Sequence, residues 1–467
     1  MDLEGYAKRL IIKKDEAAAR KLKEEIEKFK NISEKEAWEY SNAILEETKN
    51  ALLMKGDVFE YYKSGVEMGA FGVGSRGAGD FYVHEKIGKV IGKTSAVLDS
   101  SDMDDSGVVK INSINSAEID HSSSLENEPD FIVLTVDGMH SRLSAFPFLA
   151  GFHVAKAALR DIYVMGARPA AMLSDIHVAD GGDVSVIFDH IAGITAVAEL
   201  SDIPLITGST LRIGGDMVIG DRMTGCVGAV GTVQSSGLTA RNKASPGDVI
   251  LMTEGVGGGT ITTTAIYSGY KKAEEVVEKT LNIDFLTACQ ALLDNAVYKK
   301  IHVMTDVTNG GIRGDAYEIS KEANVRLVFD DDALRRCVDP IVLEMLETLA
   351  VDFRGVSIDS LLVICPEMIS KEVIKTIEKT GVKISIVGHV EEKSSGKSDT
   401  ALIIDGEEKE FKPLFRESAY TPLKKVIGEK EPADFEAMRK EVDLAADAAI
   451  KKKERIVKRI KTKCDEK

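Results

Sequence analysis

The stretch GFHVAKAALRDIYVMGARPAAMLSDI, residues 151–176, carries the strongest fold signal in this 467-residue chain. Its first part is apolar enough to form a buried helix, which Gly166 and Pro169 end. The run AAMLSDIHVA that follows has the composition of a β-strand. A helix that is followed by a turn with Gly166 and Pro169, and then by a strand, predicts an α/β fold.

Alternating strand-like and helix-like segments surround this stretch. FIVLTVDG (131–138) precedes it as a β-rich run that ends in an Asp-Gly turn signal. IPLITGS and MTGCVGAVGTV follow as strands and close a first unit near residue 235. SPGDVILMT opens a second unit, in which HVMTDVTNGGIRGDAYEIS again reads as strand, acidic loop and helix. We therefore expect two α/β domains, at residues 65–240 and 241–425.

Charged helices are expected at both ends of the chain. Residues 1–64 predict a helical extension with two helices, of which the first runs through AKRLIIKKDEAAARKLKEEIEKFK. The second opens with a capping-box pair, Ser33 and Glu36. Residues 426–467 predict a long charged helix, with eight Lys or Arg in residues 451–463.

Composition narrows the class of protein. The formal net charge of −16 argues against broad nucleic-acid binding. The five cysteines form no CxxC pair, so neither a disulfide framework nor a structural zinc site is expected, and a cytoplasmic location fits best. No apolar stretch reaches the ~18 residues that a membrane span needs.

Aspartates at strand ends are the main candidates for chemistry. Asp104 and Asp105 lie in SSDMDDSGVVKI before a strand-like run, and Asp137 ends FIVLTVD. Asp161 lies in the apolar helix, and Asp306 follows HVMT. Carboxylates in such a set suit Mg²⁺, which takes oxygen ligands and shares them with substrate phosphates. The competing interpretation is that loop aspartates make turns and caps, as most do.

Asp161 stands out because an acid near a buried helix face needs a partner or a metal ion. A cap or a salt bridge with Arg160 or Arg168 is the competing explanation. His140 and Lys156 are further candidates, for phosphate binding or acid–base chemistry, although a lone loop histidine is more often a surface residue.

A run of glycines precedes the first domain's strands, and its members include Gly72, Gly74, Gly77 and Gly79. Glycines let backbone N–H groups approach an anion, so the run could cradle phosphates. It lacks the GK[ST] of a P-loop and follows no expected strand. A flexible linker is the equally weighted alternative.

These motifs, in this order, resemble the aminoimidazole ribonucleotide synthetase-like superfamily over about residues 65–425. Its relatives include selenophosphate synthetase, thiamine-monophosphate kinase and the carbamoyl-dehydrating hydrogenase maturation factor. Residues 151–176 are the closest match, to a family segment with N-D-I or S-D-L followed by M-G-A-x-P. The other matching segments are GSRGAGDFYVHEKI, SDMDDSGVVKI, FIVLTVDGMH, IPLITGSTLR, SPGDVILMT and TDVTNGGIRGDAYEI.

The resemblance implies an N-terminal α/β domain that dimerises through its sheets into a shared β-barrel, and a C-terminal α/β domain. It implies Mg²⁺ ligands at Asp104, Asp105, Asp137 and Asp161. The residues that it implies for ATP binding are Gly72, Gly74, Gly77, Gly79, Asp161, Gly208, Ser209 and Thr210. The candidates for catalysis are Asp137, His140 and Lys156. In such sites the metal ion neutralises charge while a phosphoryl group moves.

Three departures from the family pattern keep the subfamily unassigned. Ser209 stands where the family's GG[DE]T turn has an acid, and Thr207 replaces its first glycine, so one expected carboxylate is missing. Residues 65–80 hold no cysteine, which disfavours selenide chemistry. Cys464 lies in KTKCDEK after a basic helix, a poor match to the cysteine that ends the maturation factor.

Two functions from different classes follow. The first is an ATP- and Mg²⁺-dependent homodimeric enzyme that phosphorylates or activates a small molecule, as a phosphotransferase or a ligase- or cyclase-type enzyme. The second is a catalytically weak, nucleotide-binding regulatory or scaffold subunit, which Ser209 and the added termini would favour. A role in which residues 451–463 dock RNA or a protein ranks last, because charged terminal helices are usually solvated.

Overall fold

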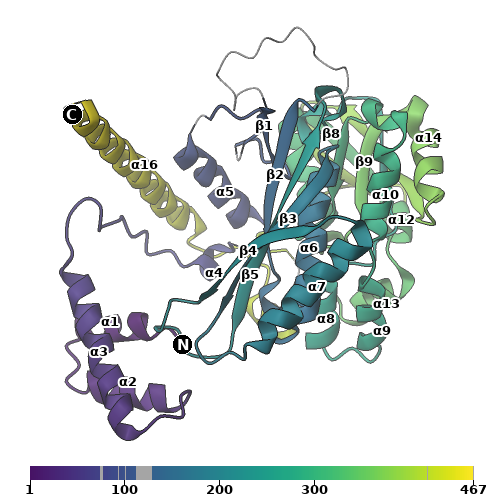
Figure 1. Cartoon of the computed structure of the whole chain (residues 1–467). Helices are drawn as coiled ribbons and strands as arrows, with labels where there is room; N and C mark the ends of the chain where they lie inside the picture. The colour runs from purple at the N-terminus through teal and green to yellow at the C-terminus, as the bar shows by residue number, and fades with distance from the viewer. Residues whose placement is uncertain (74–76, 93, 100, 112–128, 418, 466–467) are drawn as a thin grey trace.

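Two β-sheets and the helices around them form the body of the protein, and helical extensions stand beside it (Figure 1). The structure is a computed structural model, and the residues that it describes are 1–73, 77–92, 94–99, 101–111, 129–417 and 419–465. Among the described residues, no helix is long and apolar enough to cross a membrane.

The first sheet has five strands in the order β1-β2-β5-β3-β4. They are β1 (Gly107–Lys110), β2 (Phe131–Gly138), β3 (Arg168–Val178), β4 (Leu205–Arg212) and β5 (Met223–Val233). All neighbours pair antiparallel except β3 and β4, which are parallel. Helix α6 (Pro147–Val164) packs on β2, β3 and β5, and α7 (Ser185–Ser201) packs on α6. The other face keeps apolar side chains exposed, such as Val136 at 67%.

The second sheet has seven strands in the order β12-β11-β8-β10-β6-β9-β7. They are β6 (Asp248–Thr253), β7 (Val303–Asp306), β8 (Val325–Asp330), β9 (Leu361–Pro366), β10 (Ile384–Glu392), β11 (Thr400–Ile404) and β12 (Glu407–Glu410). Its helices are α8 (Gly259–Tyr267), α9 (Ala273–Thr280), α10 (Asp284–Leu293), α11 (Gly311–Ala323), α12 (Asp331–Arg336), α13 (Pro340–Thr348), α14 (Glu367–Glu378) and α15 (Pro422–Ile427). Both β9 and β10 pair antiparallel with β6, so α14 crosses between two parallel strands.

One apolar core joins the two sheets. It includes Leu159 and Ile162 of α6, Leu292 of α10, and Leu251 and Val363 from one face of the second sheet. A second core lies on the opposite face of that sheet. Close-packed cores resist sliding, so α6 is fixed against both sheets at once. The mixed α/β architecture with two sheets agrees with the prediction, and the described strands of this single chain form an open first sheet rather than a barrel.

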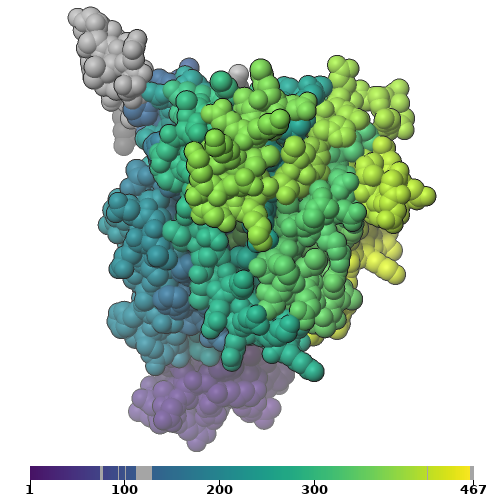
Figure 2. All heavy atoms as spheres, turned by 90° about the vertical axis from the view of Figure 1, so that its right-hand side faces the viewer, coloured from purple at the N-terminus to yellow at the C-terminus, as the bar shows by residue number. Residues whose placement is uncertain are grey.

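The N-terminal extension has three helices where the sequence predicted two. They are α1 (Leu3–Ile12), α2 (Ala18–Glu27) and α3 (Glu34–Leu53), and they form a lobe below the body (Figure 2). Helix α1 ends because the backbone of Lys14 is left-handed (φ 54°). The Asp15 carboxylate then accepts a hydrogen bond from the Ala17 N–H before α2 begins. The predicted capping box of Ser33 and Glu36 is confirmed.

At the other end, α16 (Phe435–Asp465) is the predicted charged helix. It packs on α5 (Ala78–Ile91), and its Phe435 ring lies against Phe71 at the end of α4 (Met68–Phe71). Further along α16, Lys453 donates to the last carbonyls of α5, Val90 O and Ile91 O. Lys452 donates to Val58 O and Glu60 O, so α16 ties α5 to the segment that follows α3.

Candidate active site

A cavity of about 800 Å³ lies between the two sheets. Its walls come from the segment before β1, the end of β2, α5, α6, the start of α8, α11, and the loops that precede α11 and β9. Among the described residues, seven carboxylates and two guanidinium groups line it. The carboxylates are those of Asp104, Asp105, Asp137, Asp161, Asp306, Glu318 and Asp359. So many carboxylates in a partly enclosed space are stable only if protons or cations neutralise part of their charge.

Helix α6 presents one face to this cavity, with His153, Val154, Ala157, Arg160 and Asp161 at helical spacing. The pKa of Asp161 is raised well above its usual value by burial, and then by the carboxylates of Asp306, Asp137 and Asp105. Its Oδ2 accepts a hydrogen bond from the Thr135 hydroxyl at 2.7 Å. A buried acid pushed toward its neutral form by neighbouring acids is a site that a cation would stabilise.

Neither of the two arginines considered as salt-bridge partners of Asp161 pairs with it in the structure. Arg160 pairs with Asp306 and Asp359. Arg168 pairs with Asp294 near the surface, at 2.8 Å. Asp161 therefore faces its acidic neighbours with a hydroxyl as its hydrogen-bond donor.

Asp104 and Asp105 reach the cavity from the segment before β1. Arg241, which follows the first domain, donates from its backbone N–H to Asp104 Oδ2 at 3.0 Å, and from its side chain to Asp105 Oδ1 at 2.6 Å. The Thr305 hydroxyl of β7 donates to Asp105 Oδ2 at 2.8 Å. Burial raises the pKa of Asp104 to about 6, although the Arg241 charge opposes that shift. We call Asp104, Asp105, Asp137 and Asp161 the acidic wall.

Arg241 is shared among more acids than it can neutralise. Its guanidinium is 3.0 Å from Glu318 and 3.6 Å from Asp315, both on α11, in addition to its contact with Asp105. One positive charge therefore lies beside several carboxylates, so the net charge around the acidic wall stays negative.

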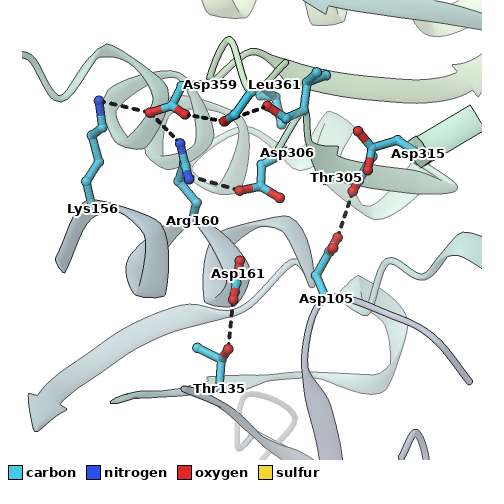
Figure 3. A network of polar contacts seen from close by, with 12 residues as sticks. Asp105, Thr135, Lys156, Arg160, Asp161, Thr305, Asp306, Asp315, Asp359 and Leu361 are labelled. Carbon is cyan, nitrogen blue, oxygen red and sulfur yellow. Dashed lines mark hydrogen bonds and ion pairs between the residues drawn. The ribbon is translucent and has the colours of Figure 1, made fainter. Parts of the chain in front are cut away.

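Lys156, Arg160, Asp306 and Asp359 form a second set of buried charges, which we call the paired network (Figure 3). Asp359 Oδ2 is 3.2 Å from Lys156 Nζ and 2.5 Å from Arg160 Nη1, and Arg160 Nε is 3.0 Å from Asp306 Oδ2. Burial alone would raise the pKa of Asp359, but the Arg160 and Lys156 charges hold it well below its usual range. The paired network therefore contains two carboxylates and two basic groups, so its charges balance.

The predicted catalytic residues occupy different positions. Asp137 lines the cavity at the end of β2. His140 also lines it, with Nε2 3.0 Å from the Tyr420 hydroxyl and Nδ1 3.1 Å from the Thr263 hydroxyl. Burial, and the charges of Lys424 and Arg142, lower the pKa of His140 to about 4. Lys156 does not line the cavity; it is 1% exposed and paired with Asp359, and burial lowers its pKa.

The predicted phosphate-binding glycines have close packing neighbours instead. A Cβ on Gly77 would lie 2.3 Å from Phe415 O, and one on Gly79 would lie 1.8 Å from Phe71 O. Gly72 is left-handed (φ 80°) and ends α4, while Gly74 lies outside the described residues. None of the described three lines the cavity, so their binding of ATP stays a prediction.

Gly208, Ser209 and Thr210 lie in β4, the edge strand of the first sheet, and are exposed. Ser209 is the register partner of Asp175 on β3. These three residues do not line the cavity of this chain, and a role for them in ATP binding likewise stays a prediction.

The acidic wall is suited to a hard divalent cation by the chemistry of its donors. Within the part of the chain that the structure describes, no three His, Cys, Asp or Glu side chains are close enough together to form a ready coordination sphere. Mg²⁺ usually keeps waters and takes only one or two carboxylates plus substrate phosphates. An acidic wall that supplies part of a sphere is therefore compatible with Mg²⁺.

Arg160, Arg241, Glu318, Asp359 and His153 are cavity residues that the sequence reasoning did not assign to the site. The α6 face could have revealed two of them, because His153 and Arg160 share helical spacing with Asp161. Arg241 and Asp359 reach the cavity only through the packing of the second sheet against α6, which no local pattern encodes.

Comparison with known proteins identifies the family. Residues 103–233 match the family described as AIR synthase related protein, N-terminal domain, and residues 245–400 match AIR synthase related protein, C-terminal domain. The chain belongs to this family. The match to an uncharacterized protein of Methanocaldococcus jannaschii is 49% identical over 474 residues, 99% of this chain and 98% of that protein, and so includes both extensions.

More distant relatives have assigned names. A selenide, water dikinase of Myxococcus xanthus is 30% identical over 185 residues, 39% of this chain and 50% of that protein. A thiamine-monophosphate kinase of Pyrococcus horikoshii is 24% identical over 188 residues, 40% of this chain and 56% of that protein.

Solved structures share the fold at low identity. Hydrogenase maturation protein HypE in complex with ATP aligns with a TM-score of 0.50 at 18% identity, over 65% of this chain and 89% of that one. ThiL complexed with AMPPCP and TMP aligns with a TM-score of 0.51 at 15% identity, over 73% of this chain and 97% of that one.

Proposed function

We propose that this protein is an ATP- and Mg²⁺-dependent enzyme that phosphorylates or activates a small molecule in the cavity between its two sheets. The observation that carries the proposal is the acidic wall, where buried carboxylates outnumber the basic groups beside them. Relatives of the family whose names are kinases, and solved relatives with ATP or AMPPCP bound, support a nucleotide as the ligand.

Asp137 and Asp161 are the residues best placed to hold Mg²⁺, and Asp104 and Asp105 lie next to them. A bound Mg²⁺ would neutralise the charge of the phosphate groups as one of them is transferred. Arg241 lies in the same cavity and contacts Asp105 of the acidic wall, while Arg160 is paired with Asp306 and Asp359. The cavity's volume falls within the range of small-molecule sites.

The proposed assembly is a homodimer that forms through the open face of the first sheet. Leu134, Val136 and Leu211 are exposed there, and Leu173 on β3 is 40% exposed. Exposed apolar side chains on one sheet face are typical of an interface. The four described cysteines are all free thiols, which suits the reducing cytoplasm that we propose as its location.

The alternative is a nucleotide-binding subunit without turnover, for which Ser209 and the helical extensions are the supporting features. Binding and turnover measurements separate the two. Under both functions, calorimetry should detect binding of AMPPNP that requires Mg²⁺ and is lost in Asp137→Asn. Release of ADP from ATP with a candidate acceptor present supports only the enzyme.

Asp332→Asn, on the exposed side of α12, is the matched control for Asp137→Asn and should bind as the wild type does. Absence of any Mg²⁺-dependent nucleotide binding by the wild-type protein would show that the acidic wall is not a metal–ATP site.

A further inference from the structure

His153 is a buried cavity residue with an unused hydrogen-bonding atom. It is 5% exposed, it lies on the α6 face that lines the cavity, and its Nδ1 has no hydrogen-bond partner among the described residues. A buried polar atom without a partner is costly, and native proteins keep one only where something else satisfies it. Nδ1 itself has almost no accessible surface, so a ligand in the cavity would become its partner through a small shift of the imidazole or of the side chains that cover it.

A chain of hydroxyl groups determines which nitrogen of His153 carries the proton. The Thr280 hydroxyl donates to Val277 O at 2.7 Å, so its one proton is used. Thr262 must then donate to Thr280 Oγ1, at 3.0 Å, because that pair needs a proton. His153 Nε2, 2.9 Å from Thr262 Oγ1, must therefore be the N–H donor to that hydroxyl. Nδ1 is left as a bare acceptor.

The charges around His153 are already committed to one another. Lys156 and Arg160 are both electrostatic neighbours of His153, and both bind Asp359. Asp359 also lies against the start of α8, where a Cβ on Gly258 would be 2.4 Å from its Oδ2. The protein's own carboxylate thus occupies the helix end and the basic pair that would otherwise attract a phosphate.

We propose that His153 Nδ1 accepts a hydrogen bond from an O–H or N–H group of the second substrate, which is an uncharged or cationic molecule rather than a phosphate ester. The proposal rests on the proposed function, because it assigns the substrate that would share the cavity with ATP. Burial, the Lys156 charge and the Arg160 charge lower the pKa of His153 to about 3, so the ring is neutral and keeps its lone pair.

The proton position can be tested without nucleotide, by long-range ¹H–¹⁵N NMR of ¹⁵N-histidine-labelled protein, with His153→Gln assigning the resonance among eight histidines. We expect a protonated Nε2 and a bare Nδ1 near neutral pH. Thr262→Val should lose this fixed tautomer. Thr264→Val should keep it, since the buried Thr264 hydroxyl donates to Thr260 O on the same helix. A proton on Nδ1, or equal spectra for the two valine variants, overturns the proposal.

The ligand class is tested by titration in the presence of Mg²⁺ and AMPPNP. The probes are glycerol against glycerol 3-phosphate, and ethanolamine against phosphoethanolamine. We expect glycerol or ethanolamine to shift the His153 Nδ1 resonance at concentrations where its phosphate ester does not. If the esters shift it equally or more, or if no probe does, the proposal is wrong.

His153→Gln should bind Mg²⁺ and AMPPNP within about twofold of the wild type, since the residue serves the other substrate. If the wild-type protein does not bind nucleotide, the proposed function is wrong, but the tautomer measurement remains valid.

Discussion

The acidic wall and the paired network both include side chains of α6, yet their buried charges are balanced to different degrees. In the paired network each carboxylate meets a basic group, and the pKa of Asp359 is held low. In the acidic wall the pKa values of Asp104 and Asp161 are raised by burial. The contrast separates carboxylates that are paired with basic groups from carboxylates that, under the proposed function, a cation would balance.

The largest effect is expected from breaking the paired network. Arg160→Met should lower the free energy of unfolding by about 3–5 kcal/mol, because it removes a buried positive charge that both Asp306 and Asp359 contact and leaves Lys156 as the one basic group of the paired network. Chemical denaturation measures this. Arg168→Met is the control, because its pair with Asp294 is exposed (51% and 57%) and should cost less than about 1 kcal/mol. Equal losses of unfolding free energy in Arg160→Met and Arg168→Met would show that the paired network stabilises the protein no more than an exposed ion pair does.

Asp161→Asn should give two effects of opposite sign. Mg²⁺-dependent AMPPNP binding should weaken at least about 100-fold, because the loss of an outer-shell partner of a metal ligand already costs about 10–100-fold. The ligand-free protein should become more stable, with a Tm rise of roughly 2–4 °C for about 1 kcal/mol, because a buried repulsion is removed. A fall in both quantities would mean that Asp161 is a structural residue.

The stability gain of Asp161→Asn should also depend on pH. An acid with a raised folded-state pKa stabilises the protein while it is protonated, and that stability is lost as pH rises through the raised value. The advantage of the variant over the wild type should therefore shrink as the pH is lowered toward the usual pKa of an aspartate. Taking the difference cancels the opposite effect of His140 and His153, whose pKa values are lowered. A constant advantage would contradict the raised pKa of Asp161.

The smallest effect is expected at Ser209, where the family pattern has an acid. Ser209→Asp should change AMPPNP affinity by less than about twofold, because the residue lies on an exposed edge strand outside the cavity. Calorimetry at fixed Mg²⁺ measures this. A gain of about tenfold would mean that β4 reaches a metal site, for instance that of a second copy.

The strands and helices around the acidic wall follow from local patterns. Residues 131–138 form the predicted strand, and the predicted helix at 150–166 is α6 (Pro147–Val164), because apolar periodicity and glycine turns act over a few residues. The break near Lys14 was missed because the charged helix pattern continues through it and only the backbone shows the left-handed turn.

The paired network could not be predicted in the same way. Its members are separated by up to about 200 residues, and the contact between Lys156 and Asp359 exists only because one apolar core joins α6 to the second sheet. The sequence prediction therefore named the acids of the cavity wall and considered Arg160 as a partner of Asp161, but it predicted neither Arg241 nor the pairing of Arg160 with Asp306 and Asp359.

The contacts between α16 and α5 have a consequence for synthesis on the ribosome. His84 and Ile87 of α5 line the cavity, and Lys453 binds the carbonyls that end this helix. A nascent chain can fold both sheets before residues 435–453 have left the exit tunnel, but α5 then still lacks this anchor. The cavity wall at α5 is therefore expected to be completed only after residues 435–453 have left the tunnel and packed against α5.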